Sequence, residues 1–215
     1  SPAAGEAPPA RPFLLATGET FSGAAPSQWW VDGYAIESDG RLVPTGPRQF
    51  LPVDSVQSVF SDTQRRFVYF GSSSSSGAQL LTYEIATGSG ALKPLGRSTG
   101  LGGWSRVALH PSGRFLYKPT GSFEVTGYEI DTKTGLVVGP LPGSPFRWSA
   151  RGGNVVTLQA APSGRFLWAT ALWVYKSQSL VSFRVDPSSG TATFSGDQDV
   201  LEPADNLAVD AHERF

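Results

Sequence analysis

The segment HPSGRFLYKP spans residues 110–119, and APSGRFLWAT at residues 161–170 repeats it about fifty residues later. In both copies a Pro-Ser-Gly sequence precedes a run of alternating aromatic and aliphatic residues. Pro, Ser and Gly favour a tight turn, and runs rich in aromatic and β-branched residues favour a strand. The two segments therefore predict a turn followed by a strand, written once in each structural unit.

Three landmarks extend this repeat along the chain, and self-similarity of this period indicates a repeat architecture. The first is an aromatic residue at the start of a strand, at Phe13, Phe67, Phe115, Phe166 and Phe215. The second is the sequence GYAI, TYEI, GYEI or SFRV, which centres on Tyr34, Tyr83, Tyr128 and Phe183. The third is a turn glycine at Gly40, Gly90, Gly135 and Gly190. The landmarks predict four copies, at about 13–54, 55–103, 104–152 and 153–203.

Each copy contains four short runs with strand character, separated by turn residues, and no run with helical periodicity. Four-stranded units of about fifty residues stack in solenoids or radiate as propeller blades, and a helix-free meander of this length favours the blade. We therefore expect an all-β chain, a β-propeller of four-stranded antiparallel blades, over residues 13–215.

The copies start out of phase with the chain, because the first copy begins on a second strand at residues 13–18. Residues 206–210 have the pattern of a first strand. This strand could pair beside residues 13–18 and close a four-bladed ring. Alternatively the four copies are part of a larger ring, or two chains join into one ring of eight blades.

Composition excludes several classes of function. The 215 residues carry 17 basic and 18 acidic side chains, so no excess of positive charge favours nucleic acid or an anionic membrane. There is no Cys, which excludes disulfides and thiolate chemistry. The apolar runs are too short for a transmembrane segment.

We interpret the Pro- and Ala-rich residues 1–12 as a leader or linker, and a first residue other than Met fits removal of an export signal.

The segments GYEIDTKTGLV (127–137), GPLPGSPF (139–146) and the two Pro-Ser-Gly-Arg-Phe-Leu runs resemble the seven-bladed β-propeller lactonase family. This family includes one type of 6-phosphogluconolactonase and has exported bacterial members. The resemblance covers about residues 13–215 and is sharpest in the third and fourth copies. It implies a ring of seven blades, of which this chain supplies about four, and an exported location that is periplasmic, on the outer surface or extracellular.

The resemblance also implies catalytic His, Glu and Arg side chains around the central channel. Its histidine-rich stretch would match residues 102–109, 152–158 and 203–209, and none of these contains His. No catalytic histidine is carried over, which favours a non-catalytic role. His110 and His212 are the only histidines, and we interpret His110 as a turn or packing residue.

The candidate ligand-binding residues are polar side chains that open the first strands, since these strands line the channel of a propeller. They are Gln57, Arg106, Asn154 and Asn206. Amides and a guanidinium could bind a small polar or anionic ligand by hydrogen bonds, although the favoured interpretation is that they only hydrate the mouth of the channel. Trp29 and Trp30 fall in a predicted loop, where burial between blades is favoured over contact with a sugar or protein. No cluster of metal ligands is visible, and we expect neither a metal nor a cofactor.

Two functions remain. The chain is either an exported, non-catalytic binding or assembly module at the cell surface, or a lactone hydrolase whose site is completed by residues outside it. The first is favoured. The expected partners are a small polar ligand and another chain, or a second copy, that completes the ring.

Overall fold

The computed structural model describes residues 13–22, 25–74, 77–87, 89–99, 106–148, 153–173, 178–200 and 207–210. Within these residues every regular element is a β-strand, as the sequence predicts. The strands form four antiparallel sheets, which follow one another along the chain. We call them blades 1 to 4.

Blade 1 contains β1 (Phe13–Ser22), β2 (Ala25–Ile36), β3 (Leu42–Pro44) and β4 (Gln49–Leu51). Blade 2 contains β5 (Ser58–Ser61), β6 (Phe67–Ser74), β7 (Gly77–Ile85) and β8 (Leu92–Thr99). Blade 3 contains β9 (Ala108–Leu109), β10 (Phe115–Gly121), β11 (Glu124–Ile130), β12 (Val137–Pro140) and β13 (Phe146–Arg147). Blade 4 contains β14 (Gly153–Ala160), β15 (Phe166–Trp173), β16 (Gln178–Val185) and β17 (Ala192–Val200).

The aromatic landmarks fix the same register in all four blades. Each opens the second strand of its blade, at the first residue of β1, β6, β10 and β15. The next residue always pairs with the aromatic of the third strand. These pairs are Leu14–Tyr34, Val68–Tyr83, Leu116–Tyr128 and Leu167–Phe183.

The turns also repeat. In the Pro-Ser-Gly turns, Gly113 and Gly164 have φ of 70° and 72°, and each donates its N–H to the residue three positions before it. The turn glycines between the third and fourth strands, Gly40, Gly90, Gly135 and Gly190, also have positive φ. Glycine adopts this left-handed backbone without the clash of a Cβ, which is why these positions recur in the sequence.

Alternate residues of each strand face opposite neighbours, so three apolar clusters fill the three junctions between blades. In β6, Val68 and Phe70 pack toward blade 1, while Phe67 and Tyr69 pack toward blade 3. The cluster between blades 3 and 4 contains Phe115 and Tyr117, which are almost fully buried. Burial of an aromatic side chain contributes about 1.5–3 kcal/mol, so these faces hold successive blades together.

A glycine–phenylalanine contact joins each pair of blades. The turn glycine of one blade lies over the phenylalanine that opens the second strand of the blade before it. These pairs are Gly90 over Phe13, Gly135 over Phe67 and Gly190 over Phe115. A Cβ on Gly190 would lie 2.7 Å from Cδ1 of Phe115. The repeated glycine is therefore required both by its backbone and by the close approach of the next blade.

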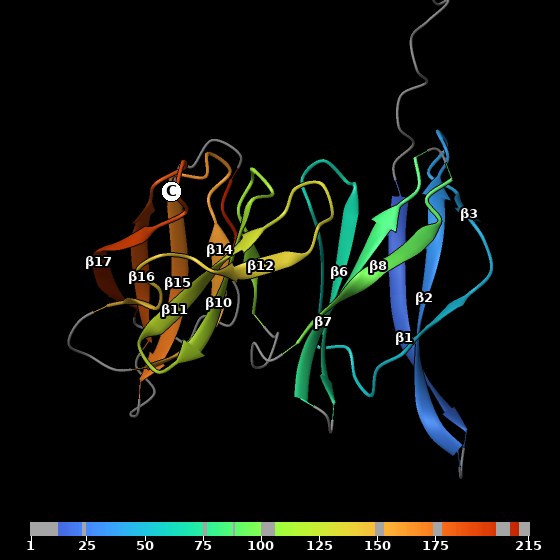
Figure 1. Ribbon diagram of the computed structural model, residues 1–215, viewed down its shortest axis with the longest axis horizontal. Helices are drawn as coiled ribbons and strands as arrows, with labels where there is room; N and C mark the ends of the chain where they lie inside the picture. The colour runs from blue at the N-terminus through green and yellow to red at the C-terminus, as the bar shows by residue number, and fades with distance from the viewer. Residues whose placement is uncertain are drawn as a thin grey trace, which may run out of the picture.

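The four blades stand in a row, with blade 1 (blue) and blade 4 (orange) at opposite ends of the molecule (Figure 1). Blade 1 lacks a first strand among the described residues, because β1 corresponds to the second strands of the other blades. The strand expected at 206–210 differs from the structure: residues 207–210 have no strand conformation, and Asn206 lies outside the described residues. The reason is the position of β1, which lies at the far end of the row from blade 4.

Candidate functional site

The best candidate site is the inner rim of blades 3 and 4, where the first strands begin. Arg106 precedes β9, and Asn154 is the second residue of β14. β9 and β14 contact one another, so the structure brings these two candidates to the same junction. The sequence placed both on first strands, but only the packing of the blades makes them neighbours.

The Arg106 side chain bridges the two blades. Its Nη1 donates a hydrogen bond to the carbonyl oxygen of Val155 at 2.7 Å. The backbone of Arg106 is left-handed, with a φ of 62°. Residues other than glycine adopt this conformation at a free-energy cost and are enriched at functional sites. One of the five guanidinium N–H donors is used by Val155, and the side chain is exposed, so donors remain for an anionic group.

The loop between β10 and β11 adds polar and aromatic groups beside Asn154. The Ser122 hydroxyl donates to Oδ1 of Asn154 at 3.1 Å. Phe123 is a second left-handed residue, with a φ of 75°, and its carbonyl accepts the N–H of Trp148 at 3.3 Å. Trp148 is buried edge-on against Phe183 of blade 4. The rim therefore combines a guanidinium, an amide, a hydroxyl and an exposed phenylalanine ring. Beneath them, Trp148 packs against Phe183 of blade 4.

The other two candidates do not join this pair. Gln57 precedes β5 in the corresponding position of blade 2, where it is exposed and its backbone N–H donates to Gly71 at 2.7 Å. No hydrogen bond between described residues links it to Arg106 or Asn154. Asn206 is outside the described residues.

His110 is a packing residue, as the sequence interpretation held. It is 3% exposed, its Nε2 donates to the carbonyl of Gly164 in blade 4 at 2.9 Å, and its Nδ1 accepts the N–H of Ser112 at 3.1 Å. These contacts fix the neutral Nε2–H form. Burial lowers the pKa of His110, although the hydrogen bond to Gly164 opposes this.

Lys118 is a buried cation that the sequence reasoning missed. It is 1% exposed and faces blade 2 from β10, in phase with the buried Leu116. Burial lowers the pKa of Lys118 from 10.5 to about 8. The signal was present in the sequence, because a strand residue two positions after an inward leucine shares its face.

The two adjacent tryptophans lie in β2, so the predicted loop at this point is wrong. Trp29 packs into the cluster between blades 1 and 2, as favoured. Trp30 lies on the opposite face of β2, stacked beneath the guanidinium of Arg48 at 3.7 Å from the ring centroid. Gly18 is the register partner of Trp30 in β1, and a Cβ on this glycine would clash with the Trp30 ring. Both rings therefore serve packing within this structure.

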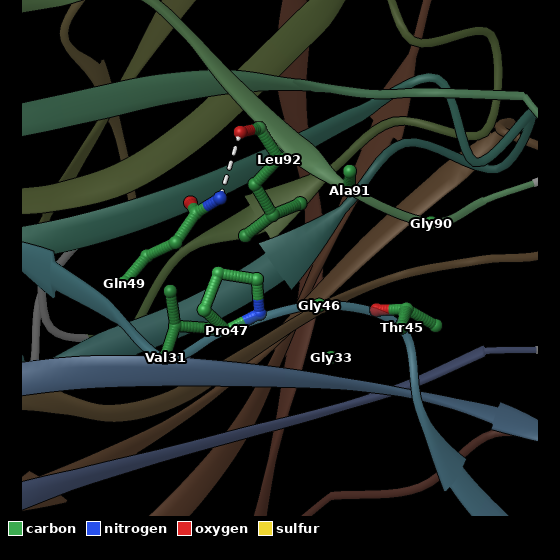
Figure 2. Close-up of a pocket in the computed structure, with 9 residues that line it drawn as sticks. All are labelled: Val31, Gly33, Thr45, Gly46, Pro47, Gln49, Gly90, Ala91 and Leu92. Carbon is green, nitrogen blue, oxygen red and sulfur yellow. Dashed lines mark hydrogen bonds between the residues drawn. The ribbon is translucent and has the colours of Figure 1, made fainter.

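A small cavity lies between blades 1 and 2 and has a volume of about 130 Å³. Figure 2 shows Val31, Pro47 and Leu92 around it, with the side chain of Gln49 reaching toward Leu92. Nε2 of Gln49 donates to the carbonyl of Leu92 at 3.1 Å. The lining has no titratable side chain, and Thr45 supplies its one hydroxyl. We interpret the cavity as a gap between two blades.

The described residues contain no group of three or more His, Cys, Asp or Glu side chains that could hold a metal ion. Asp131 and Asp186 cap their own turns, where hydrogen bonds from Lys133 and Ser188 lower the pKa of each carboxyl. In the described part of the chain, no helix is long and apolar enough to cross a membrane.

No family model matches the sequence, and neither does any curated protein. Solved structures do resemble it. A candidate 6-phosphogluconolactonase from Bacteroides fragilis has a TM-score of 0.63 at 15% identity, over 91% of this chain and 60% of that protein. The periplasmic gluconolactonase of Pseudomonas aeruginosa has a TM-score of 0.58 at 17% identity, over 92% of this chain and 57% of that protein. The chain has a β-propeller fold.

This result confirms the predicted fold class and the resemblance to lactonase propellers. A candidate 6-phosphogluconolactonase from Bacteroides uniformis agrees, with a TM-score of 0.63 at 14% identity over 90% of this chain and 60% of that protein. The propeller described here spans about 60% of the length of these structures. At such identities the likeness establishes the fold, and the chemistry of the rim has to be argued from its own residues.

Proposed function

We propose that this propeller is a non-catalytic binding module, whose rim at blades 3 and 4 holds a small polar or anionic ligand. The observation that carries the proposal is Arg106, an exposed cation with a left-handed backbone that is anchored to Val155 of the next blade. Asn154 and Ser122 add neutral hydrogen-bonding groups beside it. A carboxylate can accept two parallel N–H bonds from a guanidinium, which gives geometric specificity.

The test is calorimetric titration with gluconate, an anionic polyol, against glucose, which has similar hydroxyls and no charge. We expect gluconate to bind, and Arg106→Gln to weaken it at least tenfold, because a charge-assisted hydrogen bond contributes about 1.5–3 kcal/mol. Arg106→Lys is the matched control, because it keeps the positive charge and cannot donate two parallel N–H bonds to a carboxylate. Equal binding of both sugars, unchanged in Arg106→Gln, would contradict the proposal.

The second candidate is a lactonase-type hydrolase with a site completed outside this chain. Its support is the likeness to structures described as gluconolactonases. The test is the rate at which the protein opens δ-gluconolactone. A rate above the buffer background that Arg106→Ala abolishes would favour catalysis over binding, and a background rate in both variants would count against it.

We also propose that the protein is exported. The support is the Pro- and Ala-rich stretch at residues 1–12 and the resemblance to exported members of the lactonase family. Fractionation of the producing cells tests this, and recovery of the protein only with cytoplasmic markers would contradict it.

A further inference from the structure

Phe123 is an exposed aromatic residue in the turn that joins β10 to β11 at the rim of blade 3. It is 36% exposed and stands beside the polar groups of the candidate site. A single exposed apolar side chain is common on protein surfaces, so its exposure alone indicates little. The backbone and the anchoring of this residue are what distinguish it.

The backbone of Phe123 is held in a conformation that a bulky residue rarely adopts. Its φ is 75°, in the left-handed region where a side chain costs free energy. Glycine adopts this conformation without a clash, and the chain uses glycine at other left-handed turns such as Gly113. Glycine at position 123 would form the same turn with less strain. The fold therefore does not require an aromatic residue here.

Hydrogen bonds hold the turn in place on both sides. The Ser122 hydroxyl donates to Oδ1 of Asn154 in blade 4 at 3.1 Å. The Phe123 carbonyl accepts the N–H of Trp148 at 3.3 Å, and β13 pairs with β11 directly after the turn. The turn is thus tied to the next blade and to β13. A contact residue whose backbone is fixed in advance loses less conformational entropy when a ligand binds.

A second costly feature lies beside the exposed ring. Trp148 is 4% exposed, and its ring centre lies 6.3 Å from that of Phe123. Its indole Nε1 is buried and has no hydrogen-bond partner among the described residues. Leaving a buried donor unsatisfied costs free energy, as does a left-handed backbone. Two features that folding does not require therefore meet at one turn, and this points to a function for the turn.

The polar groups of the rim connect this ring to the cation of the site. Arg106 donates to the carbonyl of Val155, and the preceding residue of β14 is Asn154. Asn154 accepts the hydroxyl of Ser122, directly before the exposed ring. Asn154 therefore links the guanidinium to the turn that carries Phe123. A ligand that binds the guanidinium and extends past the amide reaches the phenyl ring.

The surroundings of the ring favour a small molecule over a protein partner. Surfaces that bind proteins expose contiguous apolar patches of several hundred Å². In blade 3 the exposed large apolar side chains among the described residues are Phe123 and Val138, and Val138 lies on the outer strand β12. Phe123 thus stands among polar groups, where it offers contact to one ring.

We propose that Phe123 is the stacking platform of the rim site, and that the ligand is an anionic molecule that carries an aromatic ring. Its carboxylate binds Arg106, its hydroxyl groups bind Asn154, and its ring packs on Phe123. Aromatic pairs in offset or edge-to-face contact gain free energy beyond that of burial. This inference rests on the proposed function, because it uses the same rim, and it adds the class of ligand.

Calorimetric titration with three glycosides tests the platform. Phenyl β-D-glucuronide has a carboxylate and a ring, methyl β-D-glucuronide has the carboxylate alone, and phenyl β-D-glucoside has the ring alone. We expect the phenyl glucuronide to bind about two- to tenfold more tightly than the methyl glucuronide, which is the range that an aromatic pair contributes. Phe123→Ala should remove this preference and leave the affinity for the methyl glucuronide unchanged.

Two further variants serve as matched controls. Phe123→Trp keeps an aromatic ring and should keep the preference for the phenyl glucuronide. Phe123→Gly should lose the preference and should resist urea better than Phe123→Ala, because only alanine keeps a Cβ on a left-handed backbone. A preference that persists in both the alanine and the glycine variants would overturn the proposal.

The remaining outcomes separate this inference from the proposed function. Equal affinity for the two glucuronides, weakened in both by Arg106→Gln, overturns the platform and leaves the proposed function intact. Binding of both phenyl glycosides that depends on Phe123 and not on Arg106 supports the platform and overturns an anionic ligand. If none of the three glycosides binds, both the platform and the proposed function are wrong.

Discussion

Arg65 occupies, in the turn between β5 and β6 of blade 2, the position that glycine has in the turns of blades 3 and 4. Its φ is 55°, and its N–H donates to Asp62, as Gly113 donates to His110. Aspartate at position 62 supports this turn by accepting the N–H groups of Arg66 and Phe67. The turn therefore forms without glycine, but a non-glycine residue here carries left-handed strain.

We predict that Arg65→Gly raises the free energy of unfolding by about 0.5–1 kcal/mol, because it removes this strain and only part of the gain is lost to unfolded-state entropy. Arg65→Ala is the control, since it removes the same side chain and keeps the strain. Urea titration measures both. Equal stability of the two variants would show that the Arg65 backbone is unstrained.

A second prediction concerns pH and His110. Well above 6.5, the ordinary pKa of histidine, the ring is neutral in both the folded and unfolded chain. Because burial lowers the folded-state pKa, the unfolded chain binds a proton first as pH falls, so stability decreases below pH 6.5. For one proton, the free energy of unfolding changes by at most about 1.4 kcal/mol per pH unit.

Urea unfolding at pH 7.5, 6.5 and 5.5 tests this. We expect His110→Gln to flatten the profile, since its amide can still donate to Gly164 and does not titrate. An identical slope in both proteins would assign the pH dependence to other groups.

At the element scale, the contact between turn glycine and phenylalanine sets the spacing of the blades. Gly190 and Gly113 have nearly equal φ, 72° and 70°, but different surroundings. A Cβ on Gly190 would lie 2.7 Å from Phe115 and 2.8 Å from Leu141, whereas a Cβ on Gly113 would have its nearest contact at 4.0 Å.

We predict that Gly190→Ala destabilises the protein by about 1–3 kcal/mol more than Gly113→Ala. Both variants carry the same backbone strain, and only the first also forces blades 3 and 4 apart. Thermal or urea unfolding measures the difference. If the two variants lose the same stability, the glycine is required by its backbone alone.

At the scale of the whole molecule, stability is distributed unevenly along the row of blades. The largest cluster joins blades 3 and 4, while the buried apolar side chains of blade 1 among the described residues are Val31, Ala35 and Leu51. In repeat architectures each unit is stabilised mainly by its neighbours, so a blade with one open face should open first.

Amide hydrogen exchange checks this. We expect the amides of β15 and β16 to exchange slowest and those of β2 and β3 to exchange faster. Uniform protection across all four blades would indicate a single cooperative unit that includes blade 1.

Much of this architecture could be predicted from the sequence, because the repeated aromatic residues and glycines reflect the local backbone needs of strands and turns. Phe13, Phe67, Phe115 and Phe166 open second strands, and glycines at left-handed turns mark each unit. The same reasoning failed at Trp29 and Trp30, where a predicted loop is a strand. The nearby Gly33 lowers the strand propensity of this segment. Packing against blade 2 stabilises the strand in spite of that low propensity.

Only part of the candidate site could be predicted from the sequence. The sequence selected Arg106 and Asn154 by their place before or within first strands, but it gave Gln57 and Asn206 equal weight. Which of these polar groups meet depends on the spacing of the blades. Lys118 was missed although its spacing from Leu116 on the same strand indicated a buried face.

By itself, the sequence determined the strands, their turns and the repeat, since these depend on backbone conformation and on alternation within a few residues. Only the tertiary structure decided which faces meet, that Arg106 reaches Val155, and that β1 pairs with β2 alone among the described strands. These features depend on contacts between residues some fifty positions apart, and such contacts form only when whole sheets pack against one another.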